Sequence, residues 1–330
     1  MPTSSAPGKV YLFGEHAVVY GEPAVPCAIE RRAAVTVTRR DDGRVTVAAP
    51  DLELSGFSVA FGPGEEPAVS LPSDRAKQAV RYVDAALDQA RDTADADAET
   101  VGFDVRVDSD LPLGAGLGSS AAVSVATIDA AARALGVDLS PADVADRGYQ
   151  VEHGVQSGEA SRADTFCAAM GGAVRVEGDD CREIEAPSDL PLAVGYDGGG
   201  GDTGELVAMV RGLKDEYTFA ADAVTAIGDL VRAGEAVLAD GAVDELGRLM
   251  DVNHGLLAAL GVSSRSLDAM VWAAREAGAP GAKLTGAGGG GCIVCLDPDG
   301  EAVRSLRLAP DCIEAFPAPL DVEGLRRESA

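Results

Sequence analysis

Two glycine-rich segments restrict what this chain can form and bind more than any other feature. The first is PLGAGLGSSA at positions 112–121, and the second, about 170 residues further on, is KLTGAGGGGC at 283–292. Because glycine has no Cβ, its backbone N–H groups can approach a bulky anion closely. Phosphate is the usual ligand of such segments, so both predict contact with a phosphorylated molecule.

The first segment lies between a predicted strand and a predicted helix. Residues 103–107 alternate as in a strand, and apolar residues recur at helical spacing after the segment, at Ala121, Val125, Ile128, Ala132 and Leu135. We expect Ser119 or Ser120 to cap this helix and Gly136 to end it. The unpaired N–H groups and the positive dipole at a helix start favour an anion. The glycine spacing matches neither a Walker A loop nor a dinucleotide fingerprint.

The rest of the pattern predicts strands and helices in two closely packed domains. The 330 residues slightly exceed what one core usually supports, and we place the domains at 1–185 and 186–330, near a glycine run at 198–201. Asp42-Gly43 between strands 33–38 and 45–47 is typical of a hairpin turn. Further strands are expected at 172–176, 192–197, 292–296 and 312–316, and further helices at 74–92, 141–155, 216–239, 241–259 and 264–277.

The charge excludes one class of partner. The chain has 54 Asp and Glu against 27 Lys and Arg, and its net charge of −27 would repel a nucleic-acid backbone. No apolar run approaches about 18 residues, so no membrane span is expected, and we expect no membrane among the partners. Residues 1–9 lack the basic start and apolar run of a signal peptide, which favours a cytoplasmic location.

The acidic residues are spread over the whole chain rather than gathered in a tail. Together with only four lysines, this suits a halophilic protein, since concentrated salt screens charge repulsion within roughly 3 Å. A GC-rich genome is the alternative explanation, because Ala, Gly, Arg and Asp all have GC-rich codons.

Six cysteines are scattered along the chain, and in a large cytoplasmic protein they do not indicate disulfides. Cys292 and Cys295 have the spacing of half a zinc site. They fall in a predicted strand, however, where alternation points their side chains to opposite faces. We expect no metal or redox role for them.

Three segments resemble, in the right order, the motifs of the GHMP kinase superfamily: PGKVYLFGEH at 7–16 and the two glycine-rich segments. Within the superfamily, GEHAVVYG at 14–21, NHGLLAALGVS at 253–263 and GAKLTGAGGGGC at 281–292 resemble the mevalonate kinase family. The resemblance implies a two-domain α+β GHMP kinase fold, with a ferredoxin-like C-terminal domain and a cleft for ATP and substrate between the domains. It also implies Mg²⁺-dependent transfer of phosphate from ATP to (R)-mevalonate, giving 5-phosphomevalonate.

The resemblance implies that ATP binds the first glycine-rich segment, through Pro112, Leu113, Gly114, Ala115, Gly116, Leu117, Gly118, Ser119, Ser120, Ala121 and Ala122. ATP and mevalonate are then the partners. The oligomeric state is left open, a homodimer being one option.

Phosphoryl transfer needs a cation that bridges the phosphates and a group that positions the attacking hydroxyl. The resemblance implies that Glu152 binds Mg²⁺ together with Ser120, and that Asp164 is the catalytic base. The two carboxylates are 12 positions apart, one more than in the family pattern, and Glu159 between them is a competing carboxylate. Lys9 resembles the family lysine beside the base, where its charge keeps the carboxylate ionised. Whether Asp164 or Lys9 chiefly activates the hydroxyl stays open.

The resemblance also implies a set of substrate-binding residues, namely Glu15, His16, Thr203, Gly286, Ala287 and Gly288. A structural histidine at 16 and a flexible hinge at 203 are the alternatives. We expect His153 and His254 to serve packing or helix ends.

Other functions stay open beside this one. They are a different GHMP kinase, such as phosphomevalonate kinase or mevalonate 3-kinase, a related ATP-dependent decarboxylase, and a kinase-like protein that binds ligand without turnover. The presence of Lys9, Glu152 and Asp164 together argues against a pure binding protein, which has no need of a base.

Overall fold

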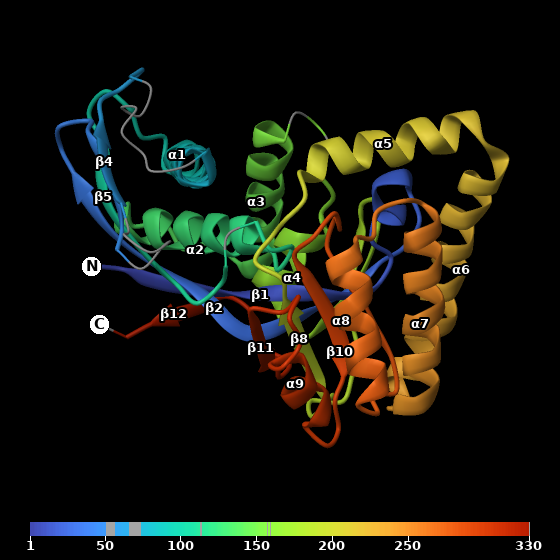
Figure 1. The fold of residues 1–330 in the computed structure, drawn as a ribbon. Coiled ribbons are helices and arrows are strands. Elements are labelled where there is room, and N and C mark those ends of the chain that lie inside the picture. The colour runs from blue at the N-terminus through green and yellow to red at the C-terminus, as the bar shows by residue number, and fades with distance from the viewer. Residues whose placement is uncertain (51–56, 66–73, 113, 157, 159, 330) are drawn as a thin grey trace.

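The computed structural model describes residues 1–330 except 51–56, 66–73, 113, 157, 159 and 330. Its described elements form two sheets with helices packed on them (Figure 1). The larger sheet has the strand order β12-β1-β2-β5-β3-β4, and β6 and β7 extend it beside β2. Its strands are β1 (Thr3–Phe13), β2 (Val25–Arg40), β3 (Val45–Ala49), β4 (Phe57–Phe61), β5 (Gly102–Ser109), β6 (Ala173–Glu177), β7 (Asp180–Ile184) and β12 (Arg326–Glu328).

Helices α1 to α4 form a layer beside the larger sheet. In this layer α2 packs directly on β1 and β2, and α1 and α3 pack on α2. They are α1 (Asp74–Thr93), α2 (Ser119–Ala134), α3 (Pro141–Val155) and α4 (Ala163–Met170), and a short 3-10 turn, η1 (Ala17–Tyr20), follows β1. The predicted bounds of α3 are confirmed, because Ser140 and Asp143 form a reciprocal capping box and a proline opens the helix. The predicted serine cap of α2 is wrong. Gly118 caps it in the left-handed conformation, and Ser120 hydrogen-bonds Glu152 instead.

The smaller sheet is antiparallel throughout, with the order β11-β8-β10-β9. Its strands are β8 (Leu192–Tyr196), β9 (Ala282–Thr285), β10 (Cys292–Leu296) and β11 (Glu314–Pro317), and its helices are α5 (Thr203–Glu216), α6 (Thr218–Ala239), α7 (Val243–Ala259), α8 (Arg265–Glu276) and α9 (Glu301–Leu306). Cys292 packs in the core shared with the larger sheet and Cys295 in the core beneath α6 to α9. The predicted opposite orientation of these two cysteines is therefore confirmed.

The predicted hairpin between β2 and β3 is wrong, although the strands and the turn exist. β5 lies between them, antiparallel to β2 and parallel to β3. Gly43 has φ +67°, and a Cβ there would lie 2.5 Å from the Glu99 carbonyl oxygen, so the turn makes room for the chain that leads into β5. A local turn signal cannot show that a later segment enters between two strands.

The two termini lie side by side, because β12 pairs with β1 (Figure 1). The last strand of the chain therefore belongs to the sheet that the first strand begins. The division at residue 185 stays a prediction.

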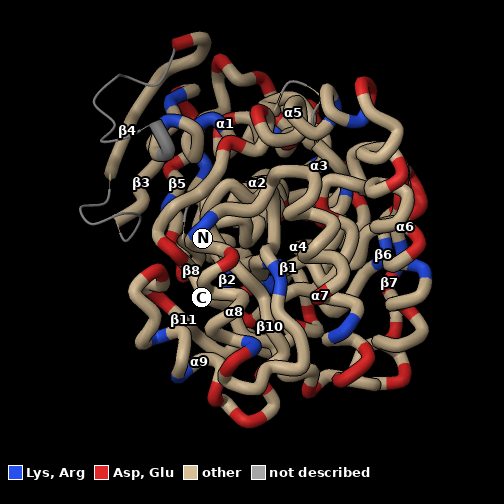
Figure 2. The backbone as a smooth tube through the Cα atoms, turned by 45° about the vertical axis from the view of Figure 1, so that its right-hand side comes forward, with Lys and Arg blue, Asp and Glu red and all other residues tan. Residues whose placement is uncertain are grey.

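Asp and Glu positions are spread along the described chain in Figure 2 rather than gathered in one segment. None of the helices in the described part of the chain combines the length and the apolar composition that a membrane span requires.

Candidate active site

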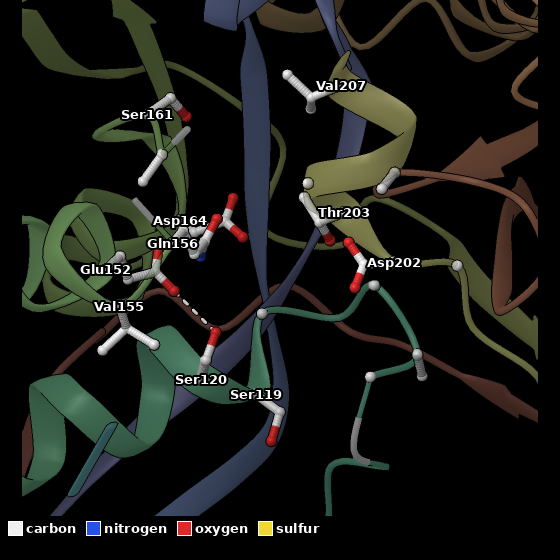
Figure 3. A pocket seen from close by; sticks show the side chains of 18 of the residues that line it. Ser119, Ser120, Glu152, Val155, Gln156, Ser161, Asp164, Asp202, Thr203 and Val207 are labelled. Atoms are coloured by element: carbon white, nitrogen blue, oxygen red, sulfur yellow. Dashed lines mark hydrogen bonds between the residues drawn. The ribbon is translucent and has the colours of Figure 1, made fainter. Parts of the chain in front are cut away.

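A cavity of about 470 Å³ lies where β1, the first glycine-rich segment, α3, α4 and the start of α5 meet. Figure 3 shows Glu152, Gln156, Ser161 and Asp164 on one side of it and Asp202, Thr203 and Val207 on the other. The cavity thus gathers side chains from segments that are far apart in the sequence.

The first glycine-rich segment forms one wall of the cavity at the start of α2. The residues of this segment that line it are Gly114, Ala115, Gly116, Gly118, Ser119 and Ser120. Pro112, Leu117, Ala121 and Ala122 are not among the lining residues, and the prediction for Leu113 falls outside the described residues. Leu117 is buried, and its carbonyl oxygen accepts the Lys9 backbone N–H at 2.9 Å. The wall offers the N–H groups of a helix start, which is an anion-binding arrangement.

The second glycine-rich segment packs against the first, backbone to backbone. A Cβ on Gly116 would lie 3.0 Å from the Thr285 carbonyl oxygen, and one on Gly291 would lie 2.8 Å from that of Ala115. Gly288 lies against the Val262 carbonyl in the same way. Of the three predicted substrate contacts here, Ala287 lines the cavity, whereas Gly286 and Gly288 are not among its lining residues. Gly286 and Gly291 therefore pack closely against the first segment, whereas Gly288 packs against the chain that follows α7.

Lys9 and Asp164 form an ion pair in the cavity, with Nζ 3.1 Å from Oδ2. Lys9 is almost fully buried, and its Nζ also donates to the Gly116 carbonyl oxygen at 3.2 Å. Asp164 is a quarter exposed, so its carboxylate is accessible from the cavity. The lysine thus ties the carboxylate to the glycine-rich wall.

Glu152 projects from α3 toward the start of α2, and its Oε1 accepts the Ser120 hydroxyl at 2.7 Å (Figure 3). Burial, with the negative charge of Asp164 as the second cause, raises the pKa of Glu152 to about 8. A buried carboxylate with a raised pKa is costly to ionise unless a cation is bound beside it. The prediction for Glu159 as a competing carboxylate falls outside the described residues.

Glu15 and His16 line the cavity at the end of β1 and are both buried. His16 Nε2 donates to the Ala287 carbonyl oxygen at 2.8 Å, and burial lowers the pKa of His16. Its φ of 61° is rare for a residue other than glycine and marks local backbone strain, which is common at functional sites. Among the described residues, Glu15 Oε2 and His16 Nδ1 are buried and find no hydrogen-bond partner.

Lys283 is fully buried and pairs with Glu15 Oε1. Its Nζ also donates to the carbonyl oxygens of Leu284, at 2.7 Å, and Tyr11, at 3.3 Å. Burial raises the pKa of Glu15 and lowers that of Lys283, while the pairing opposes both shifts. This lysine belongs to the second glycine-rich segment but reaches the N-terminal motif.

Thr203 begins α5, a helix that the sequence pattern did not predict. Asp202 caps it by accepting the Glu205 N–H at 2.9 Å, and both Asp202 and Thr203 line the cavity. The glycine run before it is held by Asp197, which accepts the N–H groups of Gly199 and Gly291 at 2.7 and 2.8 Å. The segment around Thr203 is therefore tied to the second glycine-rich segment.

Sequence reasoning missed several lining residues, of which Tyr11 lies nearest the ion pair. Its hydroxyl donates to Asp164 Oδ1 at 2.7 Å. The sequence could have indicated Tyr11, because it lies two positions after Lys9 in a strand and its side chain therefore projects from the same face. Tyr82, Gln78 and Gln156 also line the cavity, and no motif in the sequence marked them.

His254 lies outside the residues that line the cavity, and both of its ring nitrogens have partners. His254 Nδ1 accepts the Leu284 N–H at 3.3 Å, and its Nε2 lies 3.3 Å from Asp268. Burial lowers the pKa of His254 to about 4. His254 is therefore neutral near pH 7 and serves packing between α7, α8 and β9.

Family models match both halves of this architecture. Residues 76–172 match the GHMP kinases N terminal domain, residues 233–310 match the GHMP kinases C terminal model, and residues 3–39 match the galactokinase galactose-binding signature. The chain belongs to the GHMP kinase family, and the predicted fold class is confirmed.

Within that family, the chain is similar to several mevalonate kinases. It is 42% identical to the mevalonate kinase of Thermococcus onnurineus over 304 aligned residues. The alignment covers 90% of this chain and 89% of the relative. It is 44% identical over 303 residues to that of Pyrococcus horikoshii, covering 89% and 88%. The crystal structure of the Methanococcus jannaschii mevalonate kinase superposes with a TM-score of 0.78 at 26% identity, covering 96% and 98% of the two chains.

Proposed function

We propose that this protein is a mevalonate kinase that transfers the γ-phosphoryl group of ATP to the 5-hydroxyl of (R)-mevalonate. The observation that supports it most directly is the Lys9–Asp164 ion pair in one cavity with the glycine-rich wall and Glu152. The high identity to mevalonate kinases over about nine-tenths of the chain supports mevalonate as the acceptor.

The reaction needs the acceptor hydroxyl near Asp164 and the nucleotide phosphates near the glycine-rich wall. The hydroxyl oxygen attacks the γ-phosphorus, its proton passes to the Asp164 carboxylate, and the bond between the γ-phosphorus and the bridging oxygen of ADP breaks. Lys9 offsets the negative charge that gathers between the carboxylate and the transferring group. The N–H groups at the start of α2 hold the phosphates in place.

We propose Mg²⁺ as the cation that accompanies ATP, with Ser120 and Glu152 as its protein ligands. The site fits this ion, since Mg²⁺ prefers oxygen ligands and uses one or two carboxylates together with substrate phosphates. The raised pKa of Glu152 also fits, because a cation there would favour the charged carboxylate. When bound, Mg²⁺ neutralises charge on the phosphates and orients them.

Glu15, His16, Thr203 and Ala287 are the proposed contacts of the acceptor. Glu15 Oε2 and His16 Nδ1 are the buried polar atoms there without a described partner, and the hydroxyl groups of mevalonate can donate to such acceptors. A cytoplasmic location and a homodimer stay predictions.

The test is a screen for ADP release with mevalonate, phosphomevalonate, homoserine and galactose, with the mass of each product determined. Galactose belongs in the screen because residues 3–39 match a galactose-binding signature. Mevalonate should give turnover well above the other acceptors, with a product heavier by one phosphoryl group. Preference for another acceptor would assign a different GHMP kinase activity, and ADP release with loss of CO₂ would assign a decarboxylase.

A further inference from the structure

Both oxygens of the Asp164 carboxylate already have a donor in this chain. Lys9 Nζ lies 3.1 Å from Oδ2, and the Tyr11 hydroxyl donates to Oδ1 at 2.7 Å. Each carboxylate oxygen has two lone pairs, so lone pairs remain for a hydroxyl in the cavity. The two donors together restrict rotation of the carboxylate about its Cβ–Cγ bond.

Tyr11 is itself held firmly on β1. Its backbone N–H donates to Thr285 Oγ1 at 2.8 Å, and its carbonyl oxygen accepts Lys283 Nζ at 3.3 Å. Lys9 Nζ lies 4.2 Å from the centre of its ring, in a cation–π arrangement. The backbone, the ring and the hydroxyl of Tyr11 therefore each have a partner, and the phenol is a firmly held hydrogen-bond donor.

Tyr11 remains a donor over the working pH range. Burial raises the pKa of the phenol well above its ordinary value, and the negative charge of Asp164 raises it further, although a hydrogen bond with Ser161 acts in the opposite direction. The negative charge of Glu15 also raises the pKa of the phenol. A group that stays protonated cannot accept the proton of the acceptor hydroxyl, so Tyr11 is not a second base.

We propose that Tyr11 is a positioning residue that holds the Asp164 carboxylate in the orientation from which it accepts the proton of the acceptor hydroxyl. This inference rests on the proposed phosphoryl transfer. In that step the proton moves from the hydroxyl to Asp164 while the phenol keeps its own proton. The Tyr11 hydroxyl acts through Asp164 and contacts no reacting atom.

The test is Tyr11→Phe, which removes one hydroxyl and keeps the ring beneath Lys9. We expect kcat to fall about tenfold, since a misplacement of about 1 Å can cost about 100-fold and Lys9 still holds one oxygen of the carboxylate. KM and directly titrated binding of ATP and of the acceptor should stay within about twofold, because the phenol binds neither. An unchanged kcat, or a change confined to KM, would overturn the inference.

A double-variant comparison separates positioning from general support of the fold. Tyr11→Phe in an Asp164→Asn background should cost nothing further in kcat, because the group that Tyr11 orients is already lost. The same fold-loss in both backgrounds would show that Tyr11 does not act through Asp164. Radiolabelled ATP makes the slow rates of the second background measurable.

The matched control is Tyr20→Phe. The Tyr20 hydroxyl donates to the Val207 carbonyl oxygen at 2.7 Å, so this variant also loses one phenolic hydrogen bond but none to Asp164. We expect its kcat to stay within twofold of the wild-type value. Urea denaturation of Tyr11→Phe beside the wild type checks that the variant is folded, and a normal unfolding midpoint with an unchanged kcat would overturn the inference.

The acceptor used is whichever one gives turnover in the screen. A wild-type protein that leaves mevalonate unphosphorylated would refute the proposed function. A working wild-type enzyme with a fully active Tyr11→Phe variant would refute only the role of Tyr11.

Discussion

Gly286 and Gly116 lie backbone against backbone, with no space for a side chain between them. A Cβ on Gly286 would lie 2.8 Å from the Cα and 3.0 Å from the carbonyl oxygen of Gly116. Contacts this short force one segment to move. The two glycine-rich segments therefore depend on each other for their positions at the wall of the cavity.

We expect Gly286→Ala to lower the free energy of unfolding by about 3 kcal/mol, from left-handed backbone strain and the steric contact together. It should also lower kcat/KM for ATP about tenfold or more, because the wall at 114–118 is displaced. Urea denaturation and steady-state kinetics measure the two effects.

Gly136→Ala is the matched control for that variant. Gly136 has φ +83° and Gly286 has φ +82°, but a Cβ on Gly136 would meet no atom within 4 Å. Gly136→Ala should lower the free energy of unfolding only by the backbone strain, about 1–2 kcal/mol, and should leave kcat/KM for ATP unchanged. Equal effects of the two variants would show that the contact between the segments is unimportant.

Asp164→Asn should lower kcat by about 10²–10⁴-fold while both ligands still bind. The amide keeps the size of the side chain but cannot accept the hydroxyl proton or balance Lys9. The measurement is kcat beside direct binding titrations of ATP and mevalonate. Asp146→Asn, which loses an ion pair with Arg162, is the control and should stay active. A variant with about a third or more of wild-type kcat would rule out Asp164 as the base and favour Lys9.

Glu152→Gln should raise the Mg²⁺ concentration needed for half-maximal rate about tenfold or more, with KM for mevalonate little changed. The carboxylate is proposed to hold the cation of the nucleotide rather than the alcohol, and its loss removes the charged oxygen ligand. Mg²⁺ titration at fixed ATP tests this. An unaltered Mg²⁺ dependence would place the ligand elsewhere, and Glu159 would be the next candidate.

The same variant should change how stability depends on pH without nucleotide and metal. The pKa of Glu152 is raised from 4.5 to about 8 on folding, so between these values the folded state holds a proton that the unfolded state releases. Its contribution to stability is therefore present below about pH 4.5 and is lost as pH rises toward 8. Glu152→Gln does not titrate, so its urea midpoint should fall less than that of the wild type between about pH 5.5 and 8. Parallel profiles would contradict the raised pKa.

The net charge of −27 predicts that the melting temperature rises steeply with KCl. Screening shortens from about 10 Å at 0.1 M to about 3 Å at 1 M, which weakens repulsion between the spread acidic side chains. We expect a rise of about 10 °C or more between 0.1 and 3 M KCl. Sucrose is the control, because it stabilises folded proteins by being excluded from their surface and does not screen charge. An equal melting temperature at both salt concentrations would contradict this prediction.

Local patterns were sufficient for many of the elements. The bounds of α3 follow from a capping serine, a proline and helical spacing, and those of β10 from a buried apolar run. Local sequence motifs were likewise sufficient to single out Lys9, Ser120 and Glu152 as candidate site residues. These features depend on residues a few positions apart, so a linear sequence displays them directly.

The tertiary structure alone decided which of these segments meet. The sequence showed that 33–38 and 45–47 are strands, but only the fold shows that β5 separates them. It showed two glycine-rich segments, but not that Gly116 and Gly286 are in contact. The bond from Tyr11 to Asp164 spans 153 positions, and no local pattern encodes a contact at that distance along the chain. Such contacts depend on the packing of sheets and helices as whole bodies, because each element must bury its apolar face against another before its polar side chains meet.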